Sequence, residues 1–547
     1  MDDVLRRQVE AWIAEDPDPH TRQTLVELLA QGNEAELRSC FSGFLEFGTA
    51  GLRGALGPGP SRMNRAVVSK TAAGLASYMK KNGLTSIVIG RDARYGSEDF
   101  TRDTAEIMSG AGFTVYVLPR PLPTPVLAYA VRKLGCGVGV MVTASHNPPR
   151  DNGYKVYLGG TVNGVIYNGS QIIAPADKEI SREIAAAPAI PSLPRSSTWT
   201  VLDESVIDDY INAAASLVTA PKPLKIVYSA MHGVGKEVLV KSFVRAGLNE
   251  PILVAAQAEP DPDFPTVAFP NPEEPGAIDM SLEVAREVQA DLVIANDPDA
   301  DRCAAAIPDG VRGWRMLRGD EVGALLGEFM ASTATDKTGV LANSIVSSSI
   351  LKKIAARHGM PFEETLTGFK YLAKVKNLRF GYEEALGYAV DPNSVNDKDG
   401  ISAALVLAQL ASQLSSEGRT IGDYLDELWK EYGFHGTRQI SVRTANISEI
   451  DQIMGRFRND RPREIAGYPL TSFDDLERPS GDLPPTNGVR FFLDGRIRVI
   501  VRPSGTEPKV KCYLEVVETG AIDDAKLRAG QTLDKVEAEL RRLMSAH

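Results

Sequence analysis

Short apolar runs that end in polar residues recur along the chain, and segments with helical spacing separate them. Three of these runs lie between residues 68 and 215, namely "TSIVIGRD", "FTVYVLP" and "GVGVMVTASHNP". Apolar strands that alternate with helices favour a parallel sheet covered by helices on both faces. The pattern begins again at "PLKIVYSAMHGVG" and once more at "GDEVGALLGEFM". The sequence therefore predicts three α/β units in series.

The two ends of the chain have different patterns. Residues 1 to about 40 show helical spacing, with Leu5 and Val9 on one face. After about residue 435, "RQISVRT" predicts a strand, and "VRFFLDGRIRVIVRPSG" predicts a hairpin with a type I′ turn at Asp494-Gly495. A last helix is expected to have one apolar face, formed by Leu533, Val536, Leu540 and Leu543.

The expected fold class is α/β, with three tandem domains that each contain a mixed, largely parallel sheet and a smaller C-terminal α+β domain. Ligands bind at the carboxyl ends of the strands in such sheets. The expected domains are an N-terminal helical extension, three α/β domains and the α+β domain, with boundaries at 1–43, 44–218, 219–316, 317–434 and 435–547.

Composition limits the partners that this chain can have. The net charge of −11 over 547 residues argues against nucleic acid, although local basic clusters still allow a small anionic ligand. The four cysteines are widely spaced and form no CxxC pair, as expected of buried thiols in a reducing compartment. No signal-peptide pattern and no window of 18 apolar residues occurs, so we expect a cytoplasmic protein without a membrane span. The sequence does not distinguish a monomer from a homodimer.

The segment "NDPDADR" places Asp297, Asp299 and Asp301 two residues apart, directly after an apolar strand. Pro298 disfavours a helix, and in an extended loop this spacing points all three carboxylates to one side. Such close like charges repel unless a cation lies between them, and oxygen ligands suit Mg²⁺ or Ca²⁺. The glycine and glutamate of an EF-hand loop are absent. A solvated acidic turn is the alternative interpretation.

The segment "TASHNP" ends another predicted strand. Ser145 could carry a phosphoryl group whose oxygen completes the shell of a metal on the three aspartates. His146 and Asn147 could then hold the loop or hydrogen-bond the phosphate. The alternative role for Ser145 is that of a helix N-cap, because serine is common where a strand leads into a helix.

The segment "RPSGTEPKVKCY" offers a guanidinium, two hydroxyls and an ammonium, on Arg502, Ser504, Thr506 and Lys511. Backbone N–H groups around Gly505 could add an anion-binding nest, so the segment predicts a phosphate site; an incidental tight turn is the alternative. Three further signals are weak when taken alone, namely the glutamates of "FGYEEALGY", the segment "TGFK" from Thr367 to Lys370, and Lys398. P-loop, dinucleotide-binding and HExxH motifs are absent.

Together these motifs resemble one family. TASHNP, DPDADR, GYEEALG and RPSGTEP occur in that order, and the chain resembles the α-D-phosphohexomutases, the phosphoglucomutase and phosphomannomutase superfamily, from about Phe44 to its end. The segments "FGTAGLRG", "SRMN" and "PDPDFPTVAFPNPEEPGA" are most similar to the branch that contains phosphoglucomutases and phosphopentomutases. The resemblance implies four domains around a central cleft.

The resemblance also implies roles for individual residues. Ser145 matches the phosphoserine, and the three aspartates match Mg²⁺ ligands, with the phosphoserine oxygen as the fourth. Arg53 and Lys155 match basic residues beside the serine, and with Ser145 and His146 they form our predicted catalytic set. Predicted substrate contacts are Arg302, Thr367, Gly368, Glu383, Lys398, Arg502, Ser504, Gly505 and Thr506.

The implied activity is that of an isomerase that interconverts sugar 1-phosphate and 6-phosphate. A phosphoserine and a sugar 1,6-bisphosphate, which is both intermediate and activator, would carry the reaction. Lys155 is the candidate general acid or base, and the basic role would require a lowered pKa.

We favour glucose as the sugar. However, Ala385 stands where the common family loop has a serine. Phosphomannomutase and phosphopentomutase activities therefore stay open, as does a sugar-bisphosphate synthase. A non-catalytic phosphosugar-binding regulator is the alternative from a different class.

Overall fold

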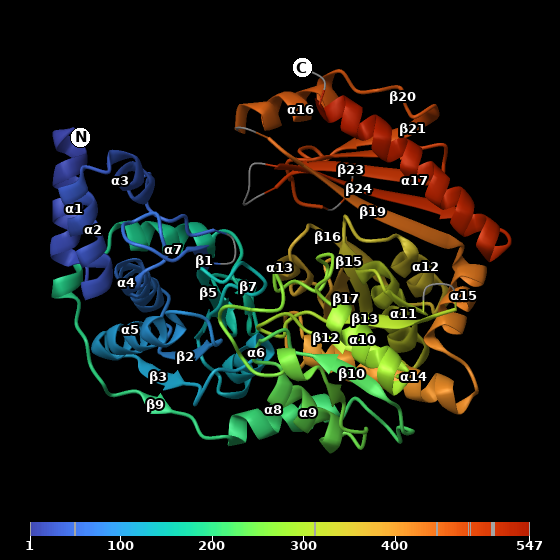
Figure 1. Cartoon of the computed structure of the whole chain (residues 1–547), viewed down its shortest axis with the longest axis horizontal. Helices are drawn as coiled ribbons and strands as arrows, with labels where there is room; N and C mark the ends of the chain where they lie inside the picture. The colour runs from blue at the N-terminus through green and yellow to red at the C-terminus, as the bar shows by residue number, and fades with distance from the viewer. Residues whose placement is uncertain are drawn as a thin grey trace. The chain divides into compact units, whose positions relative to one another are not determined.

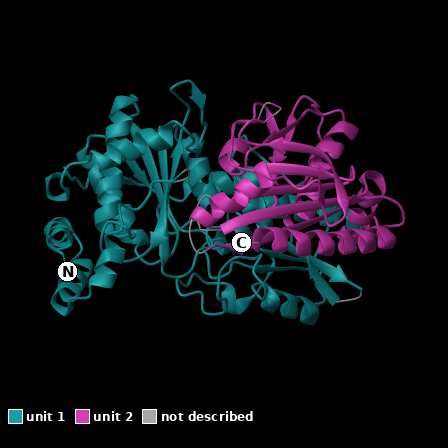
Figure 2. Ribbon diagram, turned by 90° about the horizontal axis from the view of Figure 1, so that it is seen from above, with its two compact units in different colours: residues 1–317, 385–416 teal, residues 318–384, 417–547 magenta. Residues whose placement is uncertain are grey.

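The computed structural model describes residues 2–48, 51–310, 313–444, 447–479, 481, 483–504 and 509–545. The chain divides into two compact units (Figure 2). Unit 1 comprises residues 1–317 and 385–416, and unit 2 comprises residues 318–384 and 417–547. Unit 1 is therefore discontinuous in sequence.

Unit 1 begins with the helices α1 (Asp3–Glu15), α2 (Pro19–Gln31) and α3 (Glu34–Cys40), which are blue in Figure 1. Each begins after a residue whose side chain accepts a hydrogen bond from the first turn, namely Asp2, Asp18 or Asn33. The helices share a small core of Leu5, Val9, Leu25 and Leu37. The helical pattern expected for this region is confirmed.

The first sheet of unit 1 contains the predicted serine loop, and its main strand order is β1-β5-β4-β2-β3-β9. The strands are β1 (Gly51–Ala55), β5 (Asp151–Leu158), β4 (Val138–Val142), β2 (Ser86–Arg91), β3 (Thr114–Val117) and β9 (Thr200–Val201). Strands β4, β2, β3 and β9 run parallel, whereas β5 is antiparallel to both β4 and β1. This mixture confirms the fold class expected from the sequence.

Five helices belong to this part of unit 1. They are α4 (Arg65–Lys81), α5 (Ser97–Gly110), α6 (Thr124–Lys133), α7 (Ala176–Ala185) and α8 (Ser205–Ala215). Apolar side chains of α4 and α5 pack with those of β2 and β4 in one large core.

The second sheet of unit 1 carries the aspartate loop, and its order is β11-β10-β12-β13-β14. The strands are β10 (Ile226–Ser229), β11 (Ile252–Leu253), β12 (Leu292–Ala295), β13 (Ala304–Asp309) and β14 (Gly313–Met316), with helices α9 (Lys236–Arg245) and α10 (Asp279–Val288). The chain returns to unit 1 with β18 (Gly387–Ala389) and α14 (Gly400–Ser416).

Unit 2 combines a parallel and an antiparallel sheet. In the first, β15 (Val340–Ser344) lies parallel to both β16 (Phe362–Thr365) and β17 (Leu378–Glu383), with helices α11 (Gly319–Ser332), α12 (Ile350–Arg357) and α13 (Phe369–Leu372). The second has the order β19-β24-β23-β22-β21-β20 and is antiparallel throughout.

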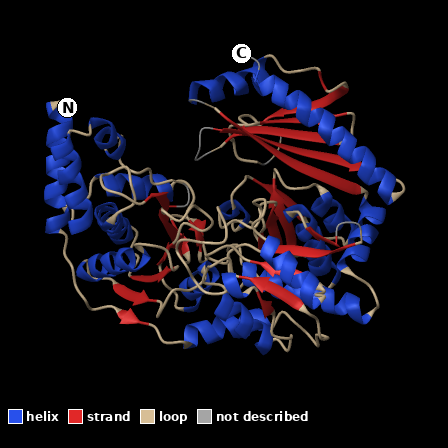
Figure 3. Ribbon diagram, viewed as in Figure 1, coloured by secondary structure: helices blue, strands red, loops and turns tan. Residues whose placement is uncertain are grey.

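The elements of the antiparallel sheet are β19 (Phe434–Arg443), β20 (Glu464–Ile465), β21 (Tyr468–Asp475), β22 (Val489–Leu493), β23 (Ile497–Pro503) and β24 (Lys509–Glu518). The remaining helices of unit 2 are α15 (Ile421–Tyr432), α16 (Ile447–Asn459) and α17 (Ile522–Ser545). Figure 3 shows α17 along this sheet, where it contacts β19 and β24.

Two local expectations for the C-terminal domain can be compared with the structure. Asp494 and Gly495 have φ angles of 51° and 67°, as a type I′ turn requires, so the predicted hairpin is confirmed. The apolar face of α17 differs at one position, because Met544 rather than Leu543 is buried after Leu540. Positions three and four residues beyond Leu540 both lie near this face of the helix, so the spacing of apolar residues does not distinguish Leu543 from Met544.

A buried polar cluster lies inside unit 2. Glu515 accepts hydrogen bonds from His435 Nδ1 at 2.9 Å and Ser348 Oγ at 2.6 Å, and Arg498 Nη2 lies 3.0 Å from its second oxygen. Asp320 of α11 accepts from the backbone N–H of Ser348 at 2.6 Å. Burial, reinforced by the nearby carboxylates of unit 2, raises the pKa of Asp320 to about 6.

Asp320→Asn should change how the stability of the protein depends on pH. The pKa of Asp320 is about 6 in the folded protein, against about 3.9 in an unfolded chain. The folded state therefore binds more protons between these values, and the contribution of Asp320 is favourable below about pH 4 and lost as pH rises through 6. Between about pH 4 and pH 7 the free energy of unfolding of Asp320→Asn should gain about 1–3 kcal/mol relative to wild type.

Urea unfolding at both pH values measures this difference. The matched control is Asp460→Asn, at an exposed aspartate of unit 2, and it should show no such gain. Equal pH dependence of Asp320→Asn and wild type would contradict the argument.

Candidate active site

The loop after β4 holds Ser145 in an unusual backbone conformation. Ser145 is 3% exposed and has a φ of 50°, in the left-handed region that residues with a side chain rarely occupy. Its N–H donates to Thr143 Oγ1 at 2.9 Å. Residues 143–150 form turns and lead into β5, so the alternative of a helix N-cap at Ser145 is wrong.

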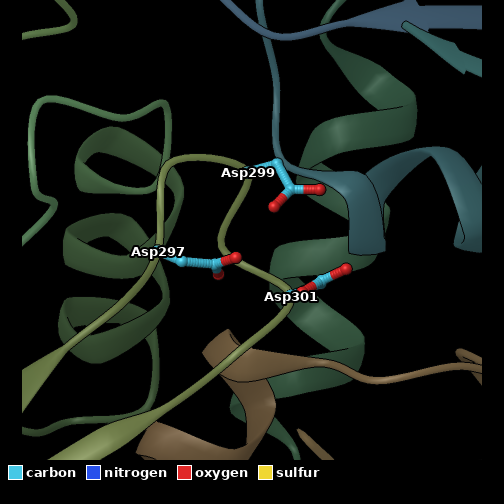
Figure 4. Close-up of side chains that lie close together, drawn as sticks. All are labelled: Asp297, Asp299 and Asp301. Atoms are coloured by element: carbon cyan, nitrogen blue, oxygen red, sulfur yellow. The ribbon is translucent and has the colours of Figure 1, made fainter. Parts of the chain in front are cut away.

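The loop after β12 brings three carboxylates together. Asp297, Asp299 and Asp301 are buried, and one oxygen of each lies within 4.8 Å of the others (Figure 4). The backbone is a turn and not the extended loop that we expected. Ala300 has a φ of 54°, and its N–H donates to the carbonyl of Asp297 at 2.8 Å. The clustering predicted from the spacing is present, although a turn produces it.

The serine and aspartate loops meet directly inside unit 1. Ser145 Oγ donates to Asp297 Oδ2 at 2.6 Å. Lys155, from the antiparallel strand β5, donates from Nζ to Asp299 Oδ2 and Asp301 Oδ2, each at 2.7 Å. The structure therefore brings a nucleophilic hydroxyl, a carboxylate cluster and an ammonium group together, and they come from two separate sheets.

The charges of this cluster shift one another's protonation. Burial, with the repulsion of Asp299 and Asp301, raises the pKa of Asp297. Burial disfavours the ammonium form of Lys155, but Asp299 and Asp301 outweigh it and raise the pKa of that group. The lowered pKa that a basic role of Lys155 would require is thus not found in this arrangement of charges.

The donor set fits a hard divalent cation. Oδ1 of Asp299 and Oδ1 of Asp301 are buried, and among the described residues neither has a hydrogen-bond partner. Buried carboxylate oxygens without a partner are costly unless they coordinate an ion. Oxygen ligands alone are the preference of Mg²⁺ and Ca²⁺.

His146, another predicted catalytic residue, lies beside Ser145. His146 Nδ1 is 3.1 Å from Ser145 Oγ. Burial, followed by the charges of Arg302 and Arg53, lowers the pKa of His146 well below its usual range, which keeps the ring neutral. Since the Ser145 hydroxyl proton is donated to Asp297, Nδ1–H of His146 is assigned as the donor to Oγ.

The arginines around this loop contact its surroundings. Arg53 of β1 donates from Nη1 to Asn147 Oδ1 at 3.1 Å. The guanidinium of Arg302 lies between carboxylates, with Nη1 3.5 Å from Glu273 Oε2 and Nε 4.0 Å from Asp297 Oδ2. Both predicted basic residues therefore lie next to the serine and aspartate loops.

Lys398 also lies in unit 1, where its Nζ donates to Asp301 Oδ2 at 2.9 Å. From the sequence we expected Lys398 to be a sugar contact, and the structure gives it a partner in the aspartate loop. Asp301 is thus bonded to two ammonium groups.

The remaining predicted residues belong to unit 2. Glu383, at the end of β17, accepts from the N–H of Gly368 at 2.6 Å, next to Thr367. Arg502 lies in β23 opposite Lys511, and the N–H of Ser504 donates to the carbonyl of Lys509 at 2.8 Å. Gly505 and Thr506 lie outside the described residues.

Thr124 contacts the aspartate loop, although no motif in the sequence singles it out. At the start of α6, its Oγ1 donates to Asp299 Oδ2 at 2.6 Å and its N–H to the carbonyl of Asp299 at 2.9 Å. The available signal was the segment "PLPTPV", in which prolines flank a threonine after a strand. Thr124 ties the first sheet to the aspartate loop of the second.

A serine beside an aspartate triad, on tandem α/β domains, is an arrangement suited to an enzyme that transfers phosphoryl groups. Family models for phosphoglucomutase/phosphomannomutase match four segments, namely α/β/α domain I at residues 45–189, domain II at 208–310, domain III at 318–432 and the C-terminal domain at 440–528. The chain belongs to the phosphoglucomutase/phosphomannomutase family, whose members are isomerases that act as intramolecular phosphotransferases. The domain boundaries that we placed from the sequence stay a prediction.

Curated relatives cover nearly the whole chain. A probable phosphomannomutase of Haemophilus influenzae is 51% identical over 87% of this chain and 96% of its own length. A phosphopentomutase of Mus musculus is 35% identical over 94% of this chain and 91% of its own. A human glucose 1,6-bisphosphate synthase is 32% identical over 100% of this chain and 94% of its own.

Solved structures share the fold. The open form of parafusin, a phosphoglucomutase from Paramecium, has a TM-score of 0.72 at 18% identity and covers 92% of this chain and 95% of its own. A putative phosphomannomutase from Thermus thermophilus has a TM-score of 0.68 at 23% identity, over 90% of this chain and 99% of its own. Of the helices that the structure describes, none is long and apolar enough to cross a membrane.

Asp299→Asn should weaken the binding of a divalent cation. The substitution removes one of three carboxylates. The amide oxygen of asparagine can still accept the hydrogen bond from Thr124, so the loop should keep its shape. We expect at least a tenfold rise in Kd, roughly 1.4 kcal/mol, for Mn²⁺ followed by its electron paramagnetic resonance signal.

The matched control is Asp279→Asn, at the exposed start of α10. It should bind Mn²⁺ as wild type does. Unchanged Mn²⁺ binding in Asp299→Asn would mean that the aspartates do not form the metal site.

Proposed function

We propose that this chain is a phosphosugar mutase that interconverts a sugar 1-phosphate and a sugar 6-phosphate through a phosphoserine at Ser145. The observation that carries the proposal is the contact of 2.6 Å between Ser145 Oγ and Asp297 Oδ2. A hydroxyl that lies against a buried carboxylate cluster is poorly suited to hold a free negative charge. It is well suited to bear a phosphoryl group once a cation balances the aspartates.

The proposed cycle moves one phosphoryl group at a time. The bond between phosphorus and Ser145 Oγ breaks while a bond forms to the free hydroxyl oxygen of the bound sugar monophosphate, which yields a sugar 1,6-bisphosphate. The hydroxyl proton leaves that oxygen, and Oγ gains a proton. The bisphosphate then turns around, and Ser145 takes the other phosphoryl group by the reverse exchange.

Asp297, Asp299 and Asp301, with an oxygen of the phosphorylated Ser145, are the proposed ligands of Mg²⁺. These ligands would hold Mg²⁺, which would supply positive charge to balance the phosphoryl group during transfer. His146 would hold Oγ through Nδ1–H, and Arg53 would hold the loop through Asn147. Lys155, an ammonium group between two aspartates, is the proposed donor of the proton to Oγ, and the general base is not assigned.

Residues of unit 2 are proposed to bind the parts of the substrate that do not react. Arg502, Ser504, Gly505 and Thr506 would bind the second phosphate, because a guanidinium makes charge-assisted bonds to a dianion. Thr367, Gly368 and Glu383 would bind the sugar hydroxyls. In unit 1, Arg302 would contact the phosphoserine, and Lys398 is proposed to contact the sugar.

Glucose 1-phosphate and glucose 6-phosphate are the substrates that we favour. Pentose phosphates are the second candidate, because Ala385 removes a hydroxyl from the sugar loop and because relatives include phosphopentomutases and a phosphoribomutase. Mannose phosphates are the third candidate substrates, because a relative is a probable phosphomannomutase. Comparison of kcat/KM for glucose, mannose and ribose 1-phosphates decides among the three.

A sugar-bisphosphate synthase is the remaining enzymatic alternative, since a relative bears that name. A mutase needs only a catalytic amount of bisphosphate, whereas a synthase consumes an external phosphoryl donor in proportion to product. A non-catalytic regulator would bind phosphosugar without turnover. Mutase assays with and without glucose 1,6-bisphosphate separate these three possibilities.

Ser145→Ala should abolish turnover while the fold is retained. The alanine has no oxygen to bear the phosphoryl group, so activity should fall by at least about 1,000-fold, the scale seen when a nucleophile is removed. Intact-mass spectrometry after incubation with glucose 1,6-bisphosphate should find one phosphoryl group on wild type and none on the variant.

The control Ser192→Ala alters an exposed serine of unit 1 and should behave as wild type. Mutase activity of Ser145→Ala near the wild-type rate would rule out the phosphoserine.

Arg502→Ala should reduce both directions of the reaction alike. The sugar must bind in two opposite orientations, and in each the phosphate that does not react would lie on the same arginine. Losing one charge-assisted bond costs about 2 kcal/mol, or roughly a 30-fold fall in kcat/KM, for the 1-phosphate and the 6-phosphate.

Ser145 of Arg502→Ala should still accept a phosphoryl group from glucose 1,6-bisphosphate. The exposed Arg463→Ala serves as the matched control and should keep wild-type kinetics. A large loss for one substrate beside an unchanged value for the other would mean that two separate phosphate sites exist.

A further inference from the structure

The side chain of Arg94 binds the serine loop through four hydrogen bonds. It follows β2 in the turn after "GRD" and is 5% exposed. Its Nη2 donates to the carbonyl oxygens of Ser145 and Asn147, each at 2.6 Å. Its Nη1 donates to the carbonyl oxygens of Pro148 at 2.8 Å and Asp151 at 3.1 Å. One guanidinium therefore donates hydrogen bonds to four carbonyl groups of a single loop.

These four carbonyls belong to the segment that holds Ser145 at its positive φ. A residue with a side chain keeps such a conformation only where its surroundings impose it. Thr143 binds the N–H of Ser145, but the carbonyl side of the peptide is bound by Arg94. The direction of the Ser145 side chain, and with it the contact of Oγ with Asp297, follows from this backbone conformation.

We propose that Arg94 is a positioning residue that clamps the loop from Ser145 to Asp151, so that Oγ of Ser145 faces the aspartate cluster. The proposal rests on the proposed function for its catalytic consequence, but the clamp itself is a property of the loop. In this role Arg94 acts through the backbone carbonyl groups of the loop.

The side chain of Arg94 is itself held by neighbouring residues. The N–H of Arg94 donates to Asp92 Oδ1 at 3.0 Å, and Nε lies 3.5 Å from Asp92 Oδ2. Ser97 Oγ fixes Asp92 with a bond of 2.7 Å. The guanidinium carbon lies over the ring of Phe264, 4.8 Å from the ring centroid. Contacts outside the loop therefore also hold the Arg94 side chain in place.

Only arginine supplies this geometry. The guanidinium is a planar fork whose two terminal nitrogens each reach two acceptors, whereas the ammonium of lysine is a single point with three donors. Burial also opposes the charge, and it lowers the pKa of Arg94. An arginine stays protonated despite the cost of burying its charge, but a lysine buried to the same extent would tend to lose its proton.

The test compares Arg94→Lys, Arg94→Gln and wild type in two measurements. The first is hydrogen exchange of the loop amides of Ser145, Asn147 and Asp151, which are hydrogen-bonded within the loop. The second is steady-state kinetics, with kcat and KM reported separately. Arg91→Lys is the matched control, since Arg91 ends β2 three residues before Arg94 and its Nη2 lies 3.6 Å from Glu98 Oε2.

In both Arg94 variants the loop amides should exchange at least about tenfold faster, while segments outside the loop keep wild-type protection. The value of kcat should fall about 100-fold, the scale of a misplaced reacting atom. KM should change less than about threefold, because the contacts with the sugar phosphate are kept. Arg91→Lys should leave both measurements unchanged.

Arg94→Gln brings no buried ammonium and keeps a donor, so it serves if Arg94→Lys does not fold. Wild-type exchange in the loop of a folded Arg94 variant would overturn the clamp. A rise in KM at unchanged kcat would do so as well, because it would make Arg94 a binding residue. A wild-type protein without mutase activity would refute the proposed function, and the exchange comparison would still decide on Arg94.

Discussion

The mutual repulsion of three buried carboxylates is the constraint on which the rest of unit 1 depends. Asp297, Asp299 and Asp301 lie within a few ångströms of one another in a turn from which water is largely excluded. Each has a partner from another element, namely Ser145 on Asp297, Thr124 and Lys155 on Asp299, and Lys155 with Lys398 on Asp301. Compensation of this charge therefore joins the two sheets of unit 1, in addition to any apolar packing between them.

The direction of strand β5 determines that Lys155 can balance the negative charge of the aspartates. Strand β5 runs antiparallel to β4, so the chain leaves the serine loop and turns back along its own sheet. Lys155 consequently lies opposite Met141 of β4 on one side and Gly51 of β1 on the other. A Cβ on Gly51 would lie 1.9 Å from the carbonyl oxygen of Tyr154, so this close pairing of β1 and β5 requires glycine.

Strand positions and the aspartate cluster could be predicted from the sequence, because apolar runs and charge spacing are local signals. "GVGVMVTASHNP" indicated β4 and its loop, and the spacing of the aspartates indicated their clustering. The left-handed turn at Ala300, the bond from Thr124 and the partner of Lys398 could not be predicted. These depend on where distant segments pack, and Lys398 follows Asp301 by 97 residues. Likewise, a one-residue difference in helical phase decides between Leu543 and Met544, which spacing alone does not resolve.

The discontinuity of unit 1 affects the order in which the protein can be completed during synthesis. Helix α14 packs in unit 1, where Gly400 approaches the carbonyl of Arg302 so closely that a Cβ would lie 2.1 Å from it. Gln409 of the same helix accepts from the N–H of Thr219 at 3.1 Å. When the ribosome has just synthesised the aspartate loop, the nascent chain still lacks helix α14 and Lys398. The ribosome must first make residues 318–384 of the other unit, so no contiguous N-terminal fragment contains the whole of unit 1 without also carrying part of unit 2.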